Sequence, residues 1–220
     1  MQRILLAGAT GLIGSTVLDL ALEDVRFDRV ITLTRKPLTP KPKLEQWVAT
    51  NEDLLAALRN EPVNAVICCL GTTMRNVGGD KARFIHVDKD LVLGLGRWAK
   101  SHGVPIFCVV SAVGADASSA IFYNRVKGEM EDGLKALGFP ALHIFQPSIL
   151  TGPRIEKRLG ERIGIAMMKV VAPLLPPRMK PMPHDMLAHA LINSTGIAVG
   201  GTHRYTEIRA LAAQKFTTVP

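Results

Sequence analysis

Gly8-Ala9-Thr10-Gly11-Leu12-Ile13-Gly14 is the stretch that decides the fold of this chain. The residues before it, 3–6, are apolar and strand-like, and apolar residues recur at helical spacing from Leu12 to Glu23. A glycine-rich turn between a first strand and a first helix holds a pyrophosphate, because glycine allows close backbone approach and the helix N-terminus attracts negative charge. The spacing G-x-x-G-x-x-G therefore predicts a nucleotide site formed by Gly8, Thr10, Gly11, Leu12, Ile13 and Gly14.

Length and composition indicate one globular domain. With 220 residues, 47% of them hydrophobic, the chain can bury a sizeable core. We expect residues 1–220 to form a single nucleotide-binding domain, with 152–183 as a lid or substrate lobe, because the alternation of strands and helices stops near residue 151. The three cysteines lie in apolar runs and indicate buried free thiols, and no Cys/His spacing resembles a metal site. No apolar run approaches the roughly 20 residues that cross a bilayer, so we expect a cytoplasmic protein without a membrane span.

The net charge of +8 is concentrated in two clusters. One cluster contains Arg35, Lys36, Lys41 and Lys43, and the other lies within residues 154–180. Neither is interleaved with aromatic residues on which bases could stack, so we expect no nucleic acid. A phosphorylated cofactor or an acidic substrate explains the clusters better.

The end of the second expected strand bears on the choice of cofactor. Residues 30–34 are apolar and β-branched, and they are followed directly by Arg35 and Lys36. In a dinucleotide-binding fold this strand end meets the adenosine ribose, where an acidic residue binds a 2′-hydroxyl and a basic residue accepts a 2′-phosphate. Arg35 and Lys36 therefore favour NADP(H) over NAD(H). The alternative is an exposed basic loop.

Strand-like and helical segments alternate along the chain. This rhythm predicts an α/β protein with a doubly wound Rossmann fold, a mostly parallel sheet of about seven strands and a small C-terminal lobe. The expected strands are residues 3–6, 30–34, 46–49, 63–70, 105–111, 141–145 and 204–208. The expected helices are residues 12–23, 52–59 (capped by Asn51), 84–102, 119–137 (capped by Ser118 or Ser119), 163–171 and 183–191.

The carboxyl ends of parallel strands border the ligand crevice. Leu70, Gly71 and Thr72 end one expected strand, and Pro147 and Ser148 follow another. We expect these five residues to lie along the cofactor.

Tyr123 and Lys127 are four residues apart on one expected helix and share a face. An ammonium close to a phenol lowers the tyrosine pKa and brings proton transfer nearer to neutral pH. Ser111, at the end of a central strand, could hold a substrate oxygen against Tyr123. Reversible carbonyl–alcohol redox requires this set, with the nicotinamide cofactor carrying the hydride. An accidental surface pair is the alternative.

Several segments resemble one enzyme superfamily. The glycine turn, Cys68–Thr73, Val87-Asp88, Ser111–Asp116 and Phe122–Glu129 are similar to the extended or atypical branch of the short-chain dehydrogenases/reductases. They resemble more narrowly the Tat-interacting-protein-like oxidoreductases. The resemblance covers nearly the whole chain and implies an NADP(H)-binding Rossmann domain with Ser111, Tyr123 and Lys127 in the catalytic places, where Tyr123 and Lys127 also contact the cofactor.

The chain departs from the superfamily pattern at three places. In extended relatives an asparagine supports the catalytic lysine through water, and a gapless count puts Asp88 at that place, so the relay is altered or absent. The third strand usually ends in an acidic residue, and here the region reads Ala49-Thr50-Asn51. The usual Arg-Pro-Gly after the sixth strand is Gln146-Pro147-Ser148. These departures bear on catalysis more than on cofactor binding.

Three functions remain open at this point. The first is an NADP(H)-dependent oxidoreductase that acts on a small carbonyl or alcohol, either acidic or apolar, with Tyr123 as acid and base. The second is a dinucleotide-binding regulatory or interaction protein with little turnover. The third is an enzyme like the sugar-nucleotide epimerases. The expected assembly is a monomer or a homodimer.

Overall fold

A seven-stranded parallel sheet forms the centre of the molecule. The structure is a computed structural model, and it describes residues 2–49, 53–151 and 180–214. The strands run in the order β3-β2-β1-β4-β5-β6-β9, and every neighbouring pair is parallel. Their bounds are Gln2–Ala7 (β1), Phe27–Thr34 (β2), Leu44–Val48 (β3), Ala65–Cys68 (β4), Ile106–Val110 (β5), Ala141–Phe145 (β6) and Gly201–His203 (β9).

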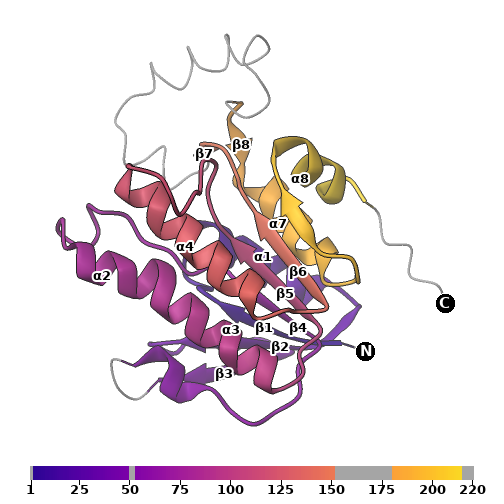
Figure 1. The fold of residues 1–220 in the computed structure, drawn as a ribbon. Helices are drawn as coiled ribbons and strands as arrows, with labels where there is room; N and C mark the ends of the chain where they lie inside the picture. The colour runs from indigo at the N-terminus through magenta and orange to yellow at the C-terminus, as the bar shows by residue number, and fades with distance from the viewer. Residues whose placement is uncertain (1, 50–52, 152–179, 215–220) are drawn as a thin grey trace.

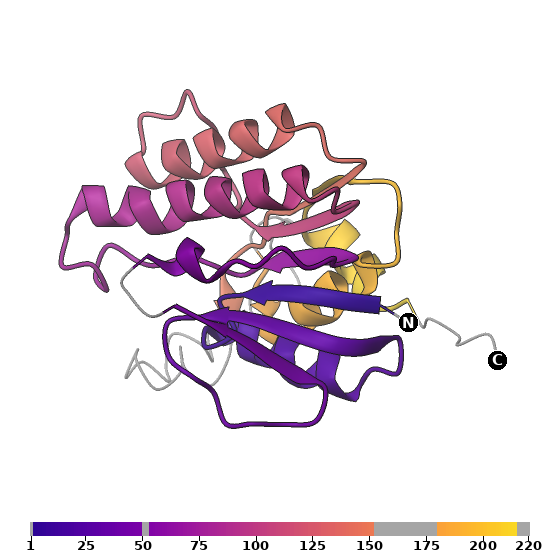
Figure 2. The ribbon, with the colours of Figure 1, turned by 90° about the horizontal axis from the view of Figure 1, so that it is seen from below.

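Helices cover both faces of this sheet (Figures 1 and 2). On one face lie α1 (Leu12–Glu23), α7 (His184–Ser194) and α8 (Tyr205–Ala212), and on the other lie α2 (Lys81–Ile85), α3 (Leu91–Ser101) and α4 (Phe122–Ala136). Side chains alternate along β1, so Ile4 and Leu6 pack with α1 while Leu5 and Ala7 pack under α3. The doubly wound Rossmann fold predicted from the sequence is confirmed.

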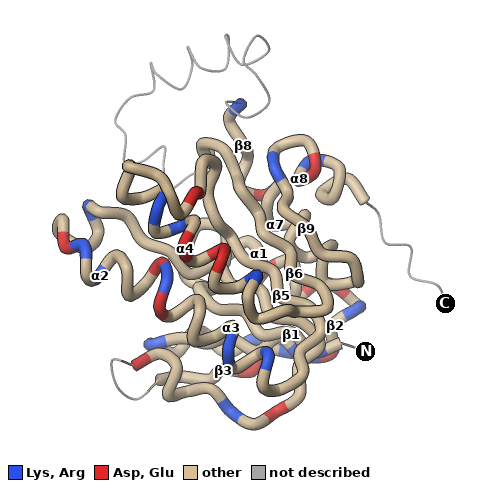
Figure 3. Tube along the Cα trace, viewed as in Figure 1, with Lys and Arg blue, Asp and Glu red and all other residues tan. Residues whose placement is uncertain are grey.

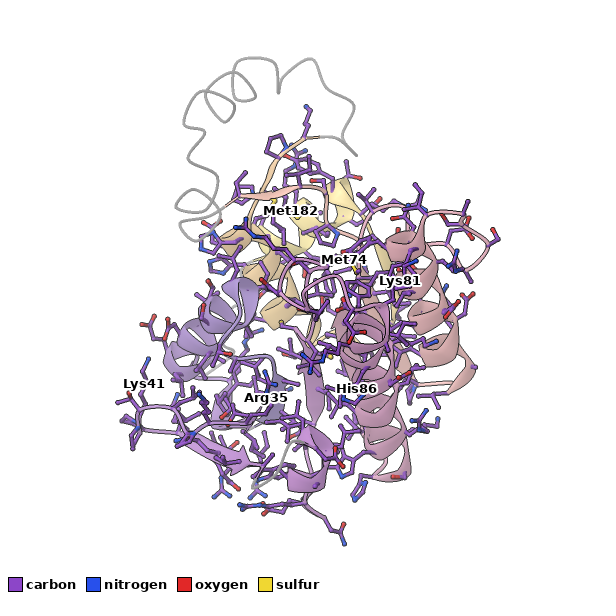
Figure 4. All side chains as sticks on the ribbon, turned by 90° about the vertical axis from the view of Figure 1, so that its left-hand side faces the viewer. Arg35, Lys41, Met74, Lys81, His86 and Met182 are labelled. Atoms are coloured by element: carbon purple, nitrogen blue, oxygen red, sulfur yellow. The ribbon has the colours of Figure 1, made fainter. Side chains whose placement is uncertain are left out.

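The strand order reverses between β1 and β4, and ligands of open α/β sheets bind at the carboxyl ends of the strands at such a point. Figure 4 views the molecule from the side to which these strand ends point. A second, two-stranded parallel sheet pairs β7 (Leu150–Thr151) with β8 (Met182–Pro183) close to this edge. The expected helix 163–171, and the expected lobe up to residue 179, lie outside the described residues.

Some expected elements differ from the structure. The expected strand 204–208 is wrong: β9 ends at His203 and α8 follows, because Tyr205, Ile208 and Leu211 form an apolar face at helical spacing. The N-terminus of α8 is closed by Glu207, whose carboxylate accepts the backbone N–H of Arg204 at 3.1 Å.

Three helix boundaries also change. The expected helix 52–59 is a short 3₁₀ turn, Leu54–Ala57, capped by Asp53 (the expected cap, Asn51, lies outside the described residues). Neither Ser118 nor Ser119 is the N-cap of α4, which begins after Ile121 without a side-chain cap. The expected helix 84–102 is interrupted by a π-helical turn at His86–Asp90.

The three cysteines are free thiols, and burial raises their pKa values, that of Cys68 to about 11.

In residues 2–49, 53–151 and 180–214, no helix is long and apolar enough to cross a membrane. Within the same residues, no three His, Cys, Asp or Glu side chains lie close enough together to hold a metal ion. Along the described trace, positions of lysine and arginine are interspersed with positions of acidic residues (Figure 3).

A pair of histidines joins the last two strands of the sheet. His143 on β6 lies edge to edge with His203 of β9, with 3.0 Å between His143 Nδ1 and His203 Nε2 and the ring planes 19° apart. His143 Nε2 faces the carbonyl of Ile197 at 3.0 Å, so this nitrogen carries the proton and Nδ1 accepts one from His203. Burial lowers the pKa of both imidazoles, that of His203 to about 4, although the carboxylate of Glu207 opposes the shift at His203.

We expect the protein to lose stability as the pH falls from 7 to 5. An imidazole whose pKa is depressed in the folded state is protonated first in the unfolded chain, so acid favours unfolding. The free energy of unfolding should fall by about 1–2 kcal/mol on account of this pair, after allowance for its partial exposure. Urea unfolding at both pH values measures the change, and the pH dependence should be flatter in the variant His203→Gln. An unchanged dependence in that variant would contradict the assignment.

Candidate functional site

The turn between β1 and α1 is built around two glycines that accept no side chain. Gly8 has a φ of +86°, and a Cβ there would lie 2.6 Å from the carbonyl oxygen of Cys69. A Cβ on Gly14 would lie 2.1 Å from the carbonyl oxygen of Gly8. At Gly11, by contrast, a Cβ would meet only the Gly8 oxygen, at 3.3 Å. Gly8 and Gly14 are therefore required by packing, whereas the space over Gly11 is open for a ligand.

The N-terminus of α1 opens onto that space. Gly11 is the N-cap and supplies no side-chain hydrogen bond, and the backbone N–H groups of a first helical turn have no partner within the helix. Leu12, Ile13 and Gly14 form this first turn. A phosphate group is the kind of ligand that such a helix end binds.

The carboxyl end of β2 presents one buried and two exposed polar side chains. The Oγ1 atom of Thr34 is buried and has no hydrogen-bond partner among the described residues. Arg35 and Lys36 follow it and are exposed. Figure 4 places Arg35 at the strand-end edge, on the same side as Lys41. A buried hydroxyl without a partner beside two cations suits a polar, anionic ligand.

A cavity of about 300 Å³ lies at the carboxyl ends of β4, β5 and β6. It brings together eight of the residues predicted from the sequence: Leu70, Gly71, Thr72, Ser111, Tyr123, Lys127, Pro147 and Ser148. Cys69, Asp88, Val110, Ala112 and Leu150 complete its lining. The glycine turn, Arg35 and Lys36 do not border this cavity.

A buried ion pair lies in the cavity wall. Lys127 Nζ is 2.8 Å from Asp88 Oδ1, and the two side chains are 4% and 1% exposed. The other carboxylate oxygen of Asp88 accepts the backbone N–H of Thr72 at 2.8 Å. Asp88 lies on the π-helical turn, a local feature that is frequent at functional sites. Asp88 thus connects the lysine of α4 directly to the loop that follows β4.

The electrostatics at Tyr123 differ from the expectation. Burial is the largest influence and raises the pKa of Tyr123; Lys127 lowers the pKa and Asp88 raises it. The net shift is upward, because burial outweighs the lowering by the Lys127 ammonium, and the carboxylate of Asp88, which pairs with that ammonium, adds to the rise. At neutral pH the phenol therefore keeps its proton, which is the form that donates to a carbonyl oxygen. Its ring packs against Phe84, with ring centroids 5.7 Å apart.

Two hydroxyls in the wall already have acceptors. Ser111 Oγ donates to Glu131 Oε1 at 2.5 Å, and Ser148 Oγ donates to the carbonyl oxygen of Lys180 at 2.5 Å. Ser111 and Ser148 were predicted from the sequence, whereas Glu131 was not. A signal existed, because Glu131 lies four residues after Lys127 and therefore on the same face of α4.

Comparison with known proteins shows the family to which the chain is related. No protein-family model matches it. Protein fmp52 of Emericella nidulans, which is named as mitochondrial, is 31% identical over 172 residues, covering 74% of this chain and 73% of the relative. Protein HTATIP2 of Rattus norvegicus is 36% identical over 167 residues, covering 73% of this chain and 67% of the relative. The chain belongs to the family of FMP52 and HTATIP2.

Membership of the FMP52 and HTATIP2 family confirms the resemblance to the Tat-interacting-protein-like group. Because several fungal members of the FMP52 and HTATIP2 family are named as mitochondrial, the comparisons do not support the expected cytoplasmic location.

Solved structures show the same fold at low sequence identity. MoeE5 in complex with UDP-glucose and NAD has a TM-score of 0.66 and 14% identity, covering 96% of this chain and 81% of that chain. The Bordetella bronchiseptica enzyme WbmH in complex with NAD⁺ has a TM-score of 0.67 and 18% identity, covering 93% and 75%. These structures support the Rossmann-like architecture.

Proposed function

We infer that the protein is an NADP(H)-binding oxidoreductase of the short-chain dehydrogenase type, which transfers hydride to or from a small carbonyl or alcohol. The observation that carries this proposal is the cavity that joins Tyr123, Lys127 and Ser111 to the loop after β4. A proton donor, a buried cation and a polar anchor around one open space meet the requirements of carbonyl reduction.

Three features support a dinucleotide as the cofactor. The open space over Gly11 and the uncapped first turn of α1 fit a pyrophosphate. The hydroxyl of Thr34, which has no hydrogen-bond partner in the described part of the chain, and the exposed Arg35 fit a phosphorylated ribose. The glycine turn and the end of β2 both lie at the carboxyl-end edge of the sheet, beside the point where the strand order reverses. Solved proteins of the same fold are described in complex with NAD.

The cofactor would supply the hydride, and this chain would supply the proton and the orientation. Tyr123 would donate its proton to the carbonyl oxygen as hydride reaches the carbon, and would take it back in the reverse reaction. Lys127 would stabilise the phenolate that remains. Glycines at 8 and 14 fix the turn, so the cofactor would be held against the wall that contains these groups.

A dinucleotide-binding regulatory protein is the second candidate. It is favoured by Ser111 and Lys127, whose polar groups are already satisfied by Glu131 and Asp88. Turnover separates the two functions. NADPH absorbance should fall when the protein is given a panel of small aldehydes and ketones, with one alcohol formed for each NADPH consumed. Bound NADPH that is never oxidised above the level of a Tyr123→Phe control would favour the regulator.

Cofactor discrimination is expected to depend on Arg35. Replacement of Arg35 by alanine should weaken NADPH binding by about 10- to 100-fold, which is the effect of one charge-assisted hydrogen bond to phosphate, and leave NADH binding unchanged. Calorimetric titration measures both affinities. Arg29→Ala is the matched control, because Arg29 lies near the start of the same strand and pairs with Glu45 at 2.9 Å. Equal losses for NADPH and NADH would show that Arg35 does not read the 2′-phosphate.

A further inference from the structure

A chain of polar side chains runs along the carboxyl ends of three adjacent strands. Ser111 follows β5, Gln146 follows β6 and Arg204 follows β9. Glu131 on α4 bonds Ser111 and Gln146, and Gln146 bonds Arg204. Figure 1 shows α4 lying over the strands of this part of the sheet. Ser111, Glu131 and Gln146 are each less than a tenth exposed. Their hydrogen bonds are therefore shielded from water, and each proton has a defined place.

The donor and the acceptor of each hydrogen bond among these four side chains can be assigned by starting from Arg204. Its Nε atom can only donate, so the Gln146 atom that faces it at 3.3 Å is the amide oxygen. The NH₂ group of Gln146 then faces Glu131, 2.9 Å from Oε1 and 3.1 Å from Oε2. Because both carboxylate oxygens accept hydrogen bonds from Gln146, Glu131 acts as an acceptor. The hydroxyl of Ser111, 2.5 Å from Oε1, must be the donor.

A serine hydroxyl has one proton, and that of Ser111 is held on the side away from the cavity. Toward the cavity Ser111 therefore offers lone pairs. We propose that Glu131 is a positioning residue that fixes this polarity, so that Ser111 accepts a hydrogen bond from the hydroxyl of an alcohol bound in the cavity. This inference rests on the proposed oxidoreductase function and specifies how its site distinguishes the two forms of the substrate.

The consequence concerns ligand recognition. An alcohol can donate to Ser111, whereas a ketone or aldehyde of the same shape has no proton to give. Tyr123, which keeps its phenolic proton at neutral pH, supplies the donor for the carbonyl form. Ser111 and Tyr123 would thus have opposite roles: the serine recognises the alcohol and the tyrosine recognises the carbonyl.

The substitution Glu131→Gln tests this polarity. Gln146 and Lys135 both approach Oε2, at 3.1 Å and 3.7 Å, so the new amide oxygen would take the place of Oε2. The NH₂ group would take the place of Oε1 and face Ser111, and the 2.9 Å hydrogen bond from Gln146 to Oε1 would be lost. Ser111 would then accept from residue 131 and direct its proton into the cavity. The shape of the site is retained while the hydrogen-bonding polarity of one group is inverted.

Binding of a matched pair of probes measures the change in the hydrogen-bonding polarity of Ser111 and requires no turnover. Cyclohexanol is titrated into the complex with NADPH and cyclohexanone into the complex with NADP⁺, since neither combination can react. In Glu131→Gln the dissociation constant of the alcohol should rise about tenfold, the effect of one hydrogen bond, while that of the ketone falls or stays the same. The control Glu129→Gln removes the same charge from α4, where Glu129 pairs with Lys89 at 2.9 Å, and should change neither constant. Parallel losses for both probes in Glu131→Gln would overturn the proposal.

A second measurement locates the Ser111 proton directly. In the protein without cofactor, a hydroxyl proton in a buried 2.5 Å hydrogen bond to a carboxylate should give a downfield, exchange-protected proton NMR resonance. It should be present in the native protein and absent from Ser111→Ala, a variant that leaves the Glu131 carboxylate bonded to Gln146 and serves even if Glu131→Gln fails to fold. Absence of the resonance from the native protein overturns the proposal. Its presence in a protein that never oxidises NADPH supports the assigned polarity and refutes the proposed function instead.

Discussion

Replacement of Tyr123 by phenylalanine should lower kcat for carbonyl reduction by about 10²- to 10⁴-fold, the usual contribution of a positioned acid. The phenolic hydroxyl borders the cavity together with Lys127 and Ser111, and no other phenol among the described residues lines it. The affinity for NADPH should change by less than about threefold, because the ring and its packing against Phe84 are kept. Steady-state rates and a calorimetric titration of NADPH measure the two quantities.

Tyr205→Phe is the matched control for this prediction. Tyr205 is the other tyrosine of the chain, begins α8 and does not line the cavity, so the same loss of a hydroxyl there should leave kcat unchanged. If Tyr123→Phe kept full kcat, proton donation would have to come from another group and the assignment of Tyr123 would be wrong.

Replacement of Asp88 by alanine should lower the free energy of unfolding by about 3–5 kcal/mol, because it leaves the ammonium of Lys127 buried without a partner. The backbone N–H of Thr72 would lose its acceptor as well. For a chain of this length the expected decrease in Tm is on the order of 10 °C. Thermal unfolding followed by circular dichroism measures it.

Asp19→Ala is the control that separates the effect of burial from the loss of an ion pair as such. Asp19 pairs with Lys41 at the same distance, 2.8 Å, but both side chains are about half exposed or more. An exposed pair contributes about 0–1 kcal/mol, so this variant should unfold within a few degrees of the native protein. Similar losses of Tm in Asp88→Ala and Asp19→Ala would contradict the importance of the buried ion pair. The Tm of Asp88→Asn should fall between those of the two variants, because asparagine keeps an acceptor for the backbone N–H of Thr72.

The sequence determined most of the fold because its signals are local and repeated. The glycine spacing defined the turn at residues 8–14, and continuous apolar runs marked the strands that are covered on both faces. The error at residues 204–208 arose because a segment of five residues with apolar side chains only at Tyr205 and Ile208 is too short to separate a strand from the start of a helix. Leu211, three residues further on, continues the helical spacing.

The candidate site was predicted in composition but not in electrostatics. The residues that line the cavity follow strand ends or share a helix face, and both patterns can be read along the chain. The partners of those residues are not given by periodicity. The resemblance placed Asp88 at the position that supports the catalytic lysine, but not its direct contact with Lys127 across 39 positions, and nothing indicated the contact of Ser111 with Glu131 across 20. The upward shift of the Tyr123 pKa comes first from burial in the folded chain, and Asp88 adds to it.

Binding of NADPH at the glycine turn is the central claim, and the change in Tm with cofactor is the most direct measurement of it. At about 100 times its dissociation constant, NADPH should raise Tm by about 5–10 °C, and NADH at the same concentration should raise it less. Gly11→Val should abolish both shifts while the unliganded protein stays folded, because its side chain fills space left open for the phosphates. An undiminished NADPH shift in Gly11→Val, or no shift in the native protein, would contradict the account.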